Sequence, residues 1–223
     1  MRILAISDIH GCLHTFKALL KQINLSKADQ LFLVGDFVDR GPDSKGVIDH
    51  IWELQEAGYA ITCLKGNHEE LLLKGYRTGR DDSVWLKHGG KATLNSFSVA
   101  AASYIPKPYI RWMDNLPLFV EHQQYIFVHA GLNFDMPNPL DAKNSMLWIR
   151  GWHDAINYDW LKDRIVIHGH TPTVKSEIEA TFERLDYLQY LDIDAGCVFD
   201  YNGFGHLCAV DLTNRELYFQ KRW

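Results

Sequence analysis

The chain has 223 residues, of which 47% are hydrophobic and 23% charged, and its formal net charge is −5. This composition is typical of a globular protein with a core and excludes a disordered chain. The negative charge, together with the lack of any Lys/Arg-rich run, argues against nucleic-acid binding. The length fits one domain that spans residues 1–223.

The N-terminal residues do not resemble a signal peptide, because Asp8 interrupts a short apolar run. No apolar stretch approaches the roughly 20 residues that a membrane-spanning helix needs. The four cysteines have no CxxC spacing, so we expect small buried side chains rather than disulfides. These features favour a cytoplasmic protein with no membrane partner.

The first two thirds of the chain alternate between strand and helix patterns. Five short apolar or β-branched runs predict buried strands: Ile3–Ile6, Gln30–Val34, Ala60–Leu64, Tyr125–Val128 and Arg164–Ile167. Two series recur at helical spacing: Leu13, Phe16, Leu19, Leu20, Ile23, and Val47, Ile48, Ile51, Leu54. The segment from about Trp85 to Pro117 is predicted to be mainly helical, with a break at Pro106 and Pro108.

The C-terminal third predicts a further group of strands. They are Val174–Glu179, Tyr190–Ile193, Leu207–Leu212 and Glu216–Gln220. Asn202-Gly203 predicts a hairpin-like turn between two of them. We therefore expect an α/β fold in which two sheets pack face to face with helices outside.

Polar residues and glycine follow each of the five earlier strands at once. The clusters are SDIHG (7–11), GDFVDRG (35–41), GNHE (66–69), HAG (129–131) and HGHT (168–171). Because the carboxyl ends of strands in open α/β sheets meet at the ligand crevice, we expect the five clusters to converge.

The residue types in these clusters predict a metal centre. Asp, His and Asn offer oxygen and imidazole ligands, and no cysteine is among them, which disfavours a structural zinc site. Their number exceeds what one ion needs, so we expect two. Two ions about 3.5–4 Å apart can clamp a phosphate and activate a bridging water. Arg40 would add a bidentate guanidinium donor to such a phosphate.

In order and content, the five clusters resemble the motifs of the phosphoprotein phosphatase family of calcineurin-like metallophosphoesterases. WLKHGG (85–90), MLWIR (146–150) and DIDAGCV (192–198) resemble segments of its bacterial and phage branch. The resemblance spans residues 7–171 and implies an α-β-β-α sandwich of two mixed sheets flanked by helices. It also implies hydrolysis of phosphate esters at a dinuclear metal centre, with a bridging hydroxide as nucleophile.

The resemblance implies a set of metal ligands. Asp8 and His10 would bind the first ion, and Asp36 would bridge both ions. Asn67, His129 and His170 would bind the second ion. We expect Mn²⁺, with Fe or Zn²⁺ as alternatives.

Four further side chains receive catalytic or substrate-binding roles from the resemblance. His68 would protonate the leaving oxygen, and Asp39 would hold its imidazolium. Arg40 and Arg150 would grip the phosphate oxygens. An arginine after Leu147-Trp148-Ile149 also suits a helix end, so this alternative stays open for Arg150.

Some neighbours of the motifs receive structural interpretations. Ser7 stands where the family usually has glycine, with little expected effect, and His88 stands where relatives often have Asn or Gln. Glu69 is interpreted as a helix-start carboxylate near the site rather than a ligand. His168 is interpreted as a structural histidine or a supporting one behind the ligands.

These residues are compatible with three functions. The leading prediction is a bacterial-type Ser/Thr protein phosphatase acting on a phosphorylated protein or a small phosphate ester. The alternative is a symmetrical diadenosine tetraphosphate hydrolase, which cleaves a phosphoanhydride. A metal-binding module without activity is disfavoured, because every expected ligand and both dyad residues are present. Nothing in the sequence demands an oligomer, which leaves a monomer as the expectation.

Overall fold

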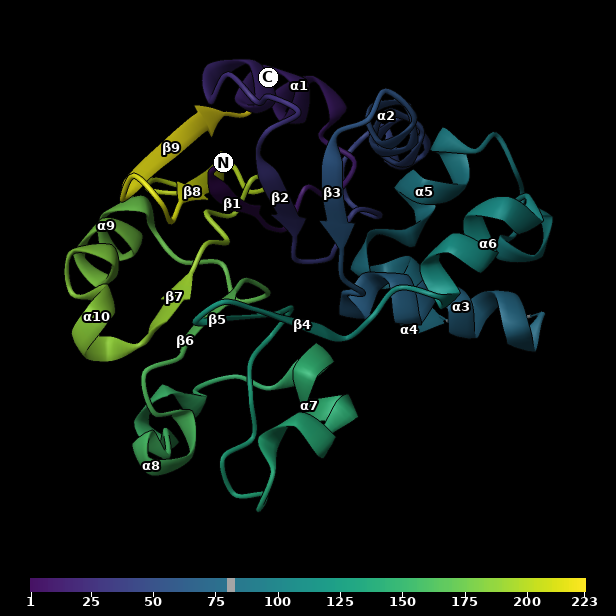
Figure 1. Ribbon diagram of the computed structural model, residues 1–223. Helices are drawn as coiled ribbons and strands as arrows, with labels where there is room; N and C mark the ends of the chain where they lie inside the picture. The colour runs from purple at the N-terminus through teal and green to yellow at the C-terminus, as the bar shows by residue number, and fades with distance from the viewer. Residues whose placement is uncertain (80–82) are drawn as a thin grey trace.

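The first sheet joins the two ends of the chain. The structure is a computed structural model that describes residues 1–79 and 83–223. Its five-stranded sheet has the order β3 (Ala60–Cys63), β2 (Gln30–Leu33), β1 (Ile3–Ile6), β8 (His206–Asp211), β9 (Glu216–Lys221). The first three of these run parallel, whereas β8 is antiparallel to β1 and β9 is antiparallel to β8 (Figure 1).

The second sheet is built from the middle of the chain. It has the order β4 (Phe119–His122), β5 (Tyr125–Val128), β6 (Ile165–His168), β7 (Tyr190–Asp192). Strands β5, β6 and β7 are parallel, and β4 is antiparallel to β5. Both sheets are therefore mixed, as the resemblance implied.

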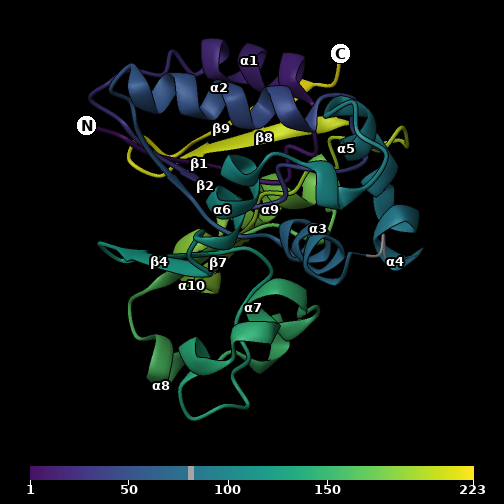
Figure 2. The same ribbon diagram turned by 90° about the vertical axis from the view of Figure 1, so that its right-hand side faces the viewer.

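Helices lie outside both sheets, as Figure 2 shows with α1 and α2 above and α7 and α8 below. The first group comprises α1 (Leu13–Gln22), α2 (Ser44–Glu56), α3 (Asn67–Thr78), α4 (Ser83–Trp85), η1 (Leu86–Gly90), α5 (Lys91–Ser96), η2 (Ala102–Tyr104) and α6 (Lys107–Asp114). The second group comprises η3 (Pro139–Asp141), α7 (Lys143–Trp148), η4 (Trp152–Ala155), α8 (Tyr158–Leu161), α9 (Lys175–Glu183) and α10 (Leu185–Leu188). The α/β fold with two packed sheets is confirmed.

Alternation along the strands divides the core into layers. On β1, Leu4 belongs to the cluster that includes α1 and α2, whereas Ala5 belongs to the cluster between the sheets. Phe32 of β2 stacks on Phe127 of β5 with ring centroids 4.0 Å apart, which joins the two sheets directly. A third cluster packs on the outer face of the second sheet and includes Trp152.

Most predicted elements are present, with bounds that shift by one or two residues. Pro106 directly precedes α6 and Pro108 lies in its first turn, where a missing N–H costs no helical hydrogen bond. No helix in the described parts of the chain has the length and hydropathy to cross a membrane.

Two C-terminal predictions are wrong. Val174–Glu179 is not a strand, because α9 begins at Lys175. Val174, Ile178 and Phe182 recur every four residues, and Ile178 is fully buried, so the helical period decides the structure. The Asn202-Gly203 turn lies in the loop that carries the chain from β7 in one sheet to β8 in the other, so it closes no hairpin.

Candidate metal centre

The five polar clusters do converge at the carboxyl ends of β1, β2, β3, β5 and β6. All predicted metal ligands are buried, and none of these residues is more than 7% exposed: Asp8, His10, Asp36, Asn67, His129 and His170. His68 and Asp39 are buried beside them, whereas Arg40 and Arg150 are exposed at the rim. The structure therefore places the predicted residues at a single site.

Asp36 lies at the middle of this site. Its Oδ2 is 3.5 Å from Nε2 of His10 and 3.5 Å from Nε2 of His129. Two candidate metal-binding groups share it: His10 and His68 form one with Asp36, and His129 and His170 form the other. One carboxylate common to two ligand groups is the arrangement that a pair of ions requires.

Hydrogen bonds to the segment that follows β2 set the orientation of two histidines. Nδ1 of His10 donates to the carbonyl of Val38 at 2.8 Å, and Nδ1 of His129 donates to that of Val34 at 2.8 Å. Because a carbonyl only accepts, Nδ1 is the donor in both rings, and Nε2 is the ring nitrogen that faces the centre. Backbone partners of this kind are typical of metal-binding histidines.

Asn67 brings a further acceptor against these rings. Its Oδ1 is 2.9 Å from Nε2 of His129 and 2.9 Å from Nδ1 of His170. An amide oxygen and two imidazole nitrogens gathered at this distance are a set of groups that can share a cation. Burial lowers the pKa of His170 to about 2, with the neighbouring His129 as a second cause, so its ring is neutral at pH 7. The donor set therefore fits a divalent metal.

Asp8 is held at the edge of the site rather than inside either ligand group. Its Oδ2 accepts a hydrogen bond from the Ser7 hydroxyl and another from the backbone N–H of His170 at 3.1 Å. The hydroxyl of Ser7 thus contacts a predicted ligand directly, although the sequence suggested little effect for this position. Burial raises the pKa of Asp36 well above its usual range, and the charge of Asp8 adds to this.

The backbone of the site is strained. Six of the ten predicted site residues have positive φ, between 43° and 74°: Asp8, His10, Asp36, Asp39, Arg40 and His170. Side chains other than glycine adopt this region rarely, and such residues concentrate at functional sites. Gly35, with φ of 97°, is required for a second reason, since a Cβ there would lie 2.8 Å from Nδ1 of His129.

Asp39 and His68 form the predicted dyad. Nδ1 of His68 donates to Oδ2 of Asp39 at 2.7 Å. Asp39 also accepts hydrogen bonds from Nε1 of Trp85 and the hydroxyl of Thr93, the latter at 2.6 Å. Burial lowers the pKa of His68, but the charge of Asp36 and the hydrogen bond that His68 donates to Asp39 outweigh it, so the pKa is raised. Trp85 and Thr93 were missed by the sequence analysis, although Trp85 opens the WLKHGG segment.

Glu69 organises the loops instead of binding a metal. Its Oε2 accepts from the backbone N–H groups of Asp36 and Gly66, at 3.0 and 2.8 Å. Its Oε1 accepts from Phe37 and Val38 at 2.8 and 3.3 Å. A single fully buried carboxylate thus ties the loop after β2 to the loop after β3. The sequence predicted that Glu69 is not a metal ligand, but it did not predict that Glu69 connects these two loops.

Arg40 reaches across the site. Its Nη1 is 2.8 Å from Nε2 of His10, and its Nη2 is 3.0 Å from Nε2 of His68. The guanidinium lies over the Phe199 ring at 5.6 Å. Its backbone N–H donates to Gly89 at 3.2 Å, and a Cβ on Gly89 would lie 2.6 Å from that nitrogen. The glycine of WLKHGG is therefore required for this close approach.

A cavity of about 190 Å³ opens onto these residues. Arg150 lines it and donates to the hydroxyl of Thr171 at 2.9 Å and to the carbonyl of His170 at 3.3 Å. These bonds direct the guanidinium to the cavity and not to the carbonyls of α7, while its phosphate-binding role stays a prediction. Trp148, which is 38% exposed, and His88 also line this cavity.

Two further buried residues of the motifs, His168 and Asp194, lie near the metal centre. His168 faces away from the metal centre, with Nε2 3.0 Å from Nε2 of His153, and burial lowers its pKa to about 3. Asp194 is 3% exposed, and burial raises its pKa well above the usual range, with the charge of Asp8 as a second cause. The DIDAGCV segment that contains Asp194 signalled this carboxylate, but no role was assigned to it.

Comparison with known proteins gives a consistent set of relatives. The family model for calcineurin-like phosphoesterases matches residues 1–206. The asymmetrical bis(5'-nucleosyl)-tetraphosphatase PrpE of Oceanobacillus iheyensis is 30% identical over 89% of this chain and 85% of that protein. Serine/threonine-protein phosphatase 1 of Salmonella typhimurium is 26% identical over 87% of this chain and 86% of that protein.

Solved structures share the fold. The crystal structure of a protein provisionally assigned as a diadenosine tetraphosphatase matches with a TM-score of 0.70 and 22% identity, over 100% of this chain and 94% of that one. At 22% identity this likeness shows a shared fold and nothing more.

Proposed function

The chain belongs to the calcineurin-like phosphoesterase family of metal-dependent hydrolases, and from that premise we propose that it cleaves a phosphoanhydride bond of dinucleoside polyphosphates. The sequence favoured a phosphoprotein substrate and kept this activity as the alternative. Relatives named as tetraphosphatases, such as that of Oceanobacillus, support the alternative, although the sequence expected symmetrical cleavage and this relative is named asymmetrical.

The metal ligands are proposed as the sequence assigned them. Asp8 and His10 would hold one ion, and Asn67, His129 and His170 the other. Asp36 would serve both ions, which its equal 3.5 Å distances to His10 and His129 support. Bound divalent ions would supply an activated water and neutralise phosphate charge. Mn²⁺ is our proposed metal, since oxygen and imidazole ligands suit it.

His68 is proposed as the general acid. Its Nδ1 is fixed by Asp39, so Nε2 is the atom that would give a proton to the leaving oxygen, and Arg40, which contacts this nitrogen at 3.0 Å, would turn to the phosphate when substrate binds. Asp39 in turn is held by Trp85 and Thr93, which keep its carboxylate from turning away. The pKa of His68 is raised, because the charge of Asp36 and the hydrogen bond to Asp39 outweigh burial, and this direction favours the protonated form that a general acid needs.

The lining of the cavity is the observation that carries the choice of substrate. Arg40 and Arg150 both border it, and their hydrogen bonds go to ring nitrogens, a hydroxyl and a carbonyl rather than to carboxylates. Two arginines beside a dinuclear centre suit a polyphosphate, which carries more negative charge than a phosphate monoester. The exposed indole of Trp148 adds a surface on which a base can stack.

A Ser/Thr protein phosphatase is the second candidate. The Salmonella relative, which is named as such an enzyme, aligns over more than four fifths of both chains and supports this reading. The metal ligands and the dyad would serve phosphate monoester hydrolysis equally well, so the second arginine and the exposed indole are what favour the polyphosphate.

A cytoplasmic location accompanies the proposal. The four cysteines are free and buried, as is usual for proteins of a reducing compartment.

A substrate panel on the manganese-loaded protein tests the choice. We expect kcat/KM for diadenosine tetraphosphate to exceed that for phosphoserine, phosphothreonine and phosphotyrosine peptides by about tenfold or more. Chromatography of the products would show which phosphoanhydride bond of diadenosine tetraphosphate is cleaved. ATP with AMP indicates asymmetrical cleavage, and ADP alone indicates symmetrical cleavage. A preference for any phosphopeptide would overturn the proposal in favour of the second candidate.

A further inference from the structure

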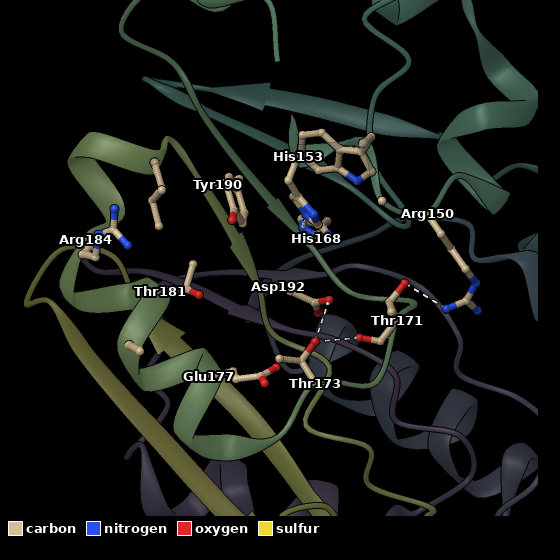
Figure 3. Close-up of a pocket in the computed structure, with 14 residues that line it drawn as sticks. Arg150, His153, His168, Thr171, Thr173, Glu177, Thr181, Arg184, Tyr190 and Asp192 are labelled. Atoms are coloured by element: carbon tan, nitrogen blue, oxygen red, sulfur yellow. Dashed lines mark hydrogen bonds between the residues drawn. The ribbon is translucent and has the colours of Figure 1, made fainter. Parts of the chain in front are cut away.

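A second, larger cavity lies directly beside the metal centre. It encloses about 490 Å³ between the segment after α7, strand β6 with its following loop, helix α9 and strand β7 (Figure 3). Arg150 lines both this cavity and the smaller one over the metal ligands. The two spaces are therefore neighbours that share one guanidinium, and a volume of this size is in the range of small-molecule sites.

The middle of the larger cavity carries acceptors for hydroxyl and amino groups. The carboxyls of Glu177 and Asp192 line it, and the hydroxyl of Thr173 donates to the carbonyl of Thr171 at 3.0 Å and to Asp192 at 3.2 Å. Glu177 belongs to no ion pair within the described residues, so it is free to bind a ligand. Burial raises the pKa of Asp192 well above its usual range, so the exposed Glu177 is the carboxylate that would repel a phosphate from this part of the cavity.

One wall of the larger cavity is aromatic. The rings of Tyr190 and His153 lie 4.2 Å apart at an interplanar angle of 30°, and both residues line the cavity. Trp152 packs behind His153 with ring centroids 4.4 Å apart, which fixes the wall from the side of the core. Figure 3 shows Tyr190 and His153 on the same side of the cavity, across from Thr173 and Glu177.

We propose that this cavity binds one nucleoside of the substrate. The phosphate chain would pass Arg150 on its way to the metal centre. The ribose hydroxyls would donate to Glu177 and Asp192, and the base would lie against the Tyr190–His153 wall. Arg150 is shared with the smaller cavity, the carboxyls lie on one wall and the aromatic rings on the opposite wall, so phosphate, ribose and base would each meet a group of suitable chemistry. This inference rests on the proposed function, since it names the part of the chain that would recognise that substrate.

Filling the cavity provides the test. Ala180 lines it from the exposed side of α9, so Ala180→Trp places an indole there without disturbing the core. Ser176→Trp is the matched control, because Ser176 is an exposed residue of the same helix that does not line the cavity. The probes are ADP and inorganic pyrophosphate, which carry the same two phosphates with and without a nucleoside, titrated calorimetrically into the manganese-loaded protein.

Wild type should bind ADP about tenfold or more tightly than pyrophosphate, since stacking of one base contributes that much. Ala180→Trp should abolish this preference, and Ser176→Trp should keep it. An unchanged preference in Ala180→Trp, an equal loss of affinity for both probes, or no preference in wild type would each overturn the inference.

The outcome separates this inference from the proposed function. Cleavage of diadenosine tetraphosphate with no nucleoside preference at the cavity would overturn the inference and leave the proposed function standing. A preference for ADP that Ala180→Trp abolishes would support the nucleoside site even if phosphopeptides proved to be the better substrates.

Discussion

The metal centre and the cavity beside it are built on different physical terms. The predicted metal ligands are at most 7% exposed, and several depend on a positive φ that the surrounding hydrogen bonds enforce. The cavity takes Arg150 and Glu177 from exposed positions, and Tyr190 from a half-buried one. The comparison teaches that burial and backbone strain fix the predicted reacting groups, whereas the groups that would recognise the substrate lie at positions more exposed to solvent.

The contrast follows from what each region must do. Left-handed backbone costs about 1–2 kcal/mol per residue, so the loops hold it only where other bonds compensate. Glu69 provides such bonds by accepting from four backbone N–H groups of two loops. If this view is right, substitutions at the metal centre impair every substrate, and substitutions in the cavity impair nucleotides selectively.

The largest effect is expected from Asp36→Asn. The neutral amide weakens both ion sites at once. Because bound ions lower the barrier to hydrolysis by several kcal/mol, turnover should fall by about 10³-fold or more. Metal content, measured by plasma emission spectroscopy, should fall with it, while the exposed control Asp163→Asn keeps both. Two metals retained per chain in Asp36→Asn would contradict the shared role of this carboxylate.

His68→Asn should come next. Loss of the general acid lowers turnover by about 10²–10⁴-fold, while metal content stays near normal because the ligands remain. The loss should be smaller for p-nitrophenyl phosphate, whose leaving group needs little protonation. His14→Asn, an exposed histidine of α1, is the control. Equal losses of turnover on diadenosine tetraphosphate and p-nitrophenyl phosphate would argue that His68 is a metal ligand. It belongs to one of the two candidate metal-binding groups, with His10 and Asp36.

Glu69→Gln should have an intermediate effect. An amide NH₂ would face backbone N–H donors, which costs about 1–3 kcal/mol of unfolding free energy. Metal affinity should fall by about 10–100-fold, as for other residues that support ligands. Glu70→Gln, at the partly exposed next position, should leave stability and metal affinity near the wild-type values. Thermal melts and metal titrations of both variants would check this, and similar behaviour of the two would contradict the organising role.

The smallest effect is expected in the cavity, from Glu177→Gln. A neutral acceptor binds a ribose hydroxyl less strongly, by about 1 kcal/mol, so the ratio of kcat/KM for diadenosine tetraphosphate to that for p-nitrophenyl phosphate should fall about fivefold. Steady-state kinetics on both substrates measures the ratio. A ratio that stays constant would remove the distinction between the two regions at this residue.

The sequence predicted much of the fold because local patterns suffice there. Ile3–Ile6 is β1 in both, and the helical spacing around Leu19 and Ile48 corresponds to α1 and α2. It failed at α9, where Val174 and its neighbours suggested a strand although burial follows a helical period. It also could not see that the chain changes sheets between β7 and β8, because strand pairing depends on residues distant in the chain.

For the site, the sequence by itself determined the chemistry. The order and types of residues in five short motifs predicted the metal ligands, the His68–Asp39 dyad and the arginines, because strand ends in such folds converge. Only the tertiary structure decided how they are held and what lies next to them. Trp85 and Thr93 reach Asp39 from about fifty residues away, and Arg150, Glu177 and Tyr190 meet only because β6, α9 and β7 fold together. Such contacts have no local signal, since packing and not spacing creates them.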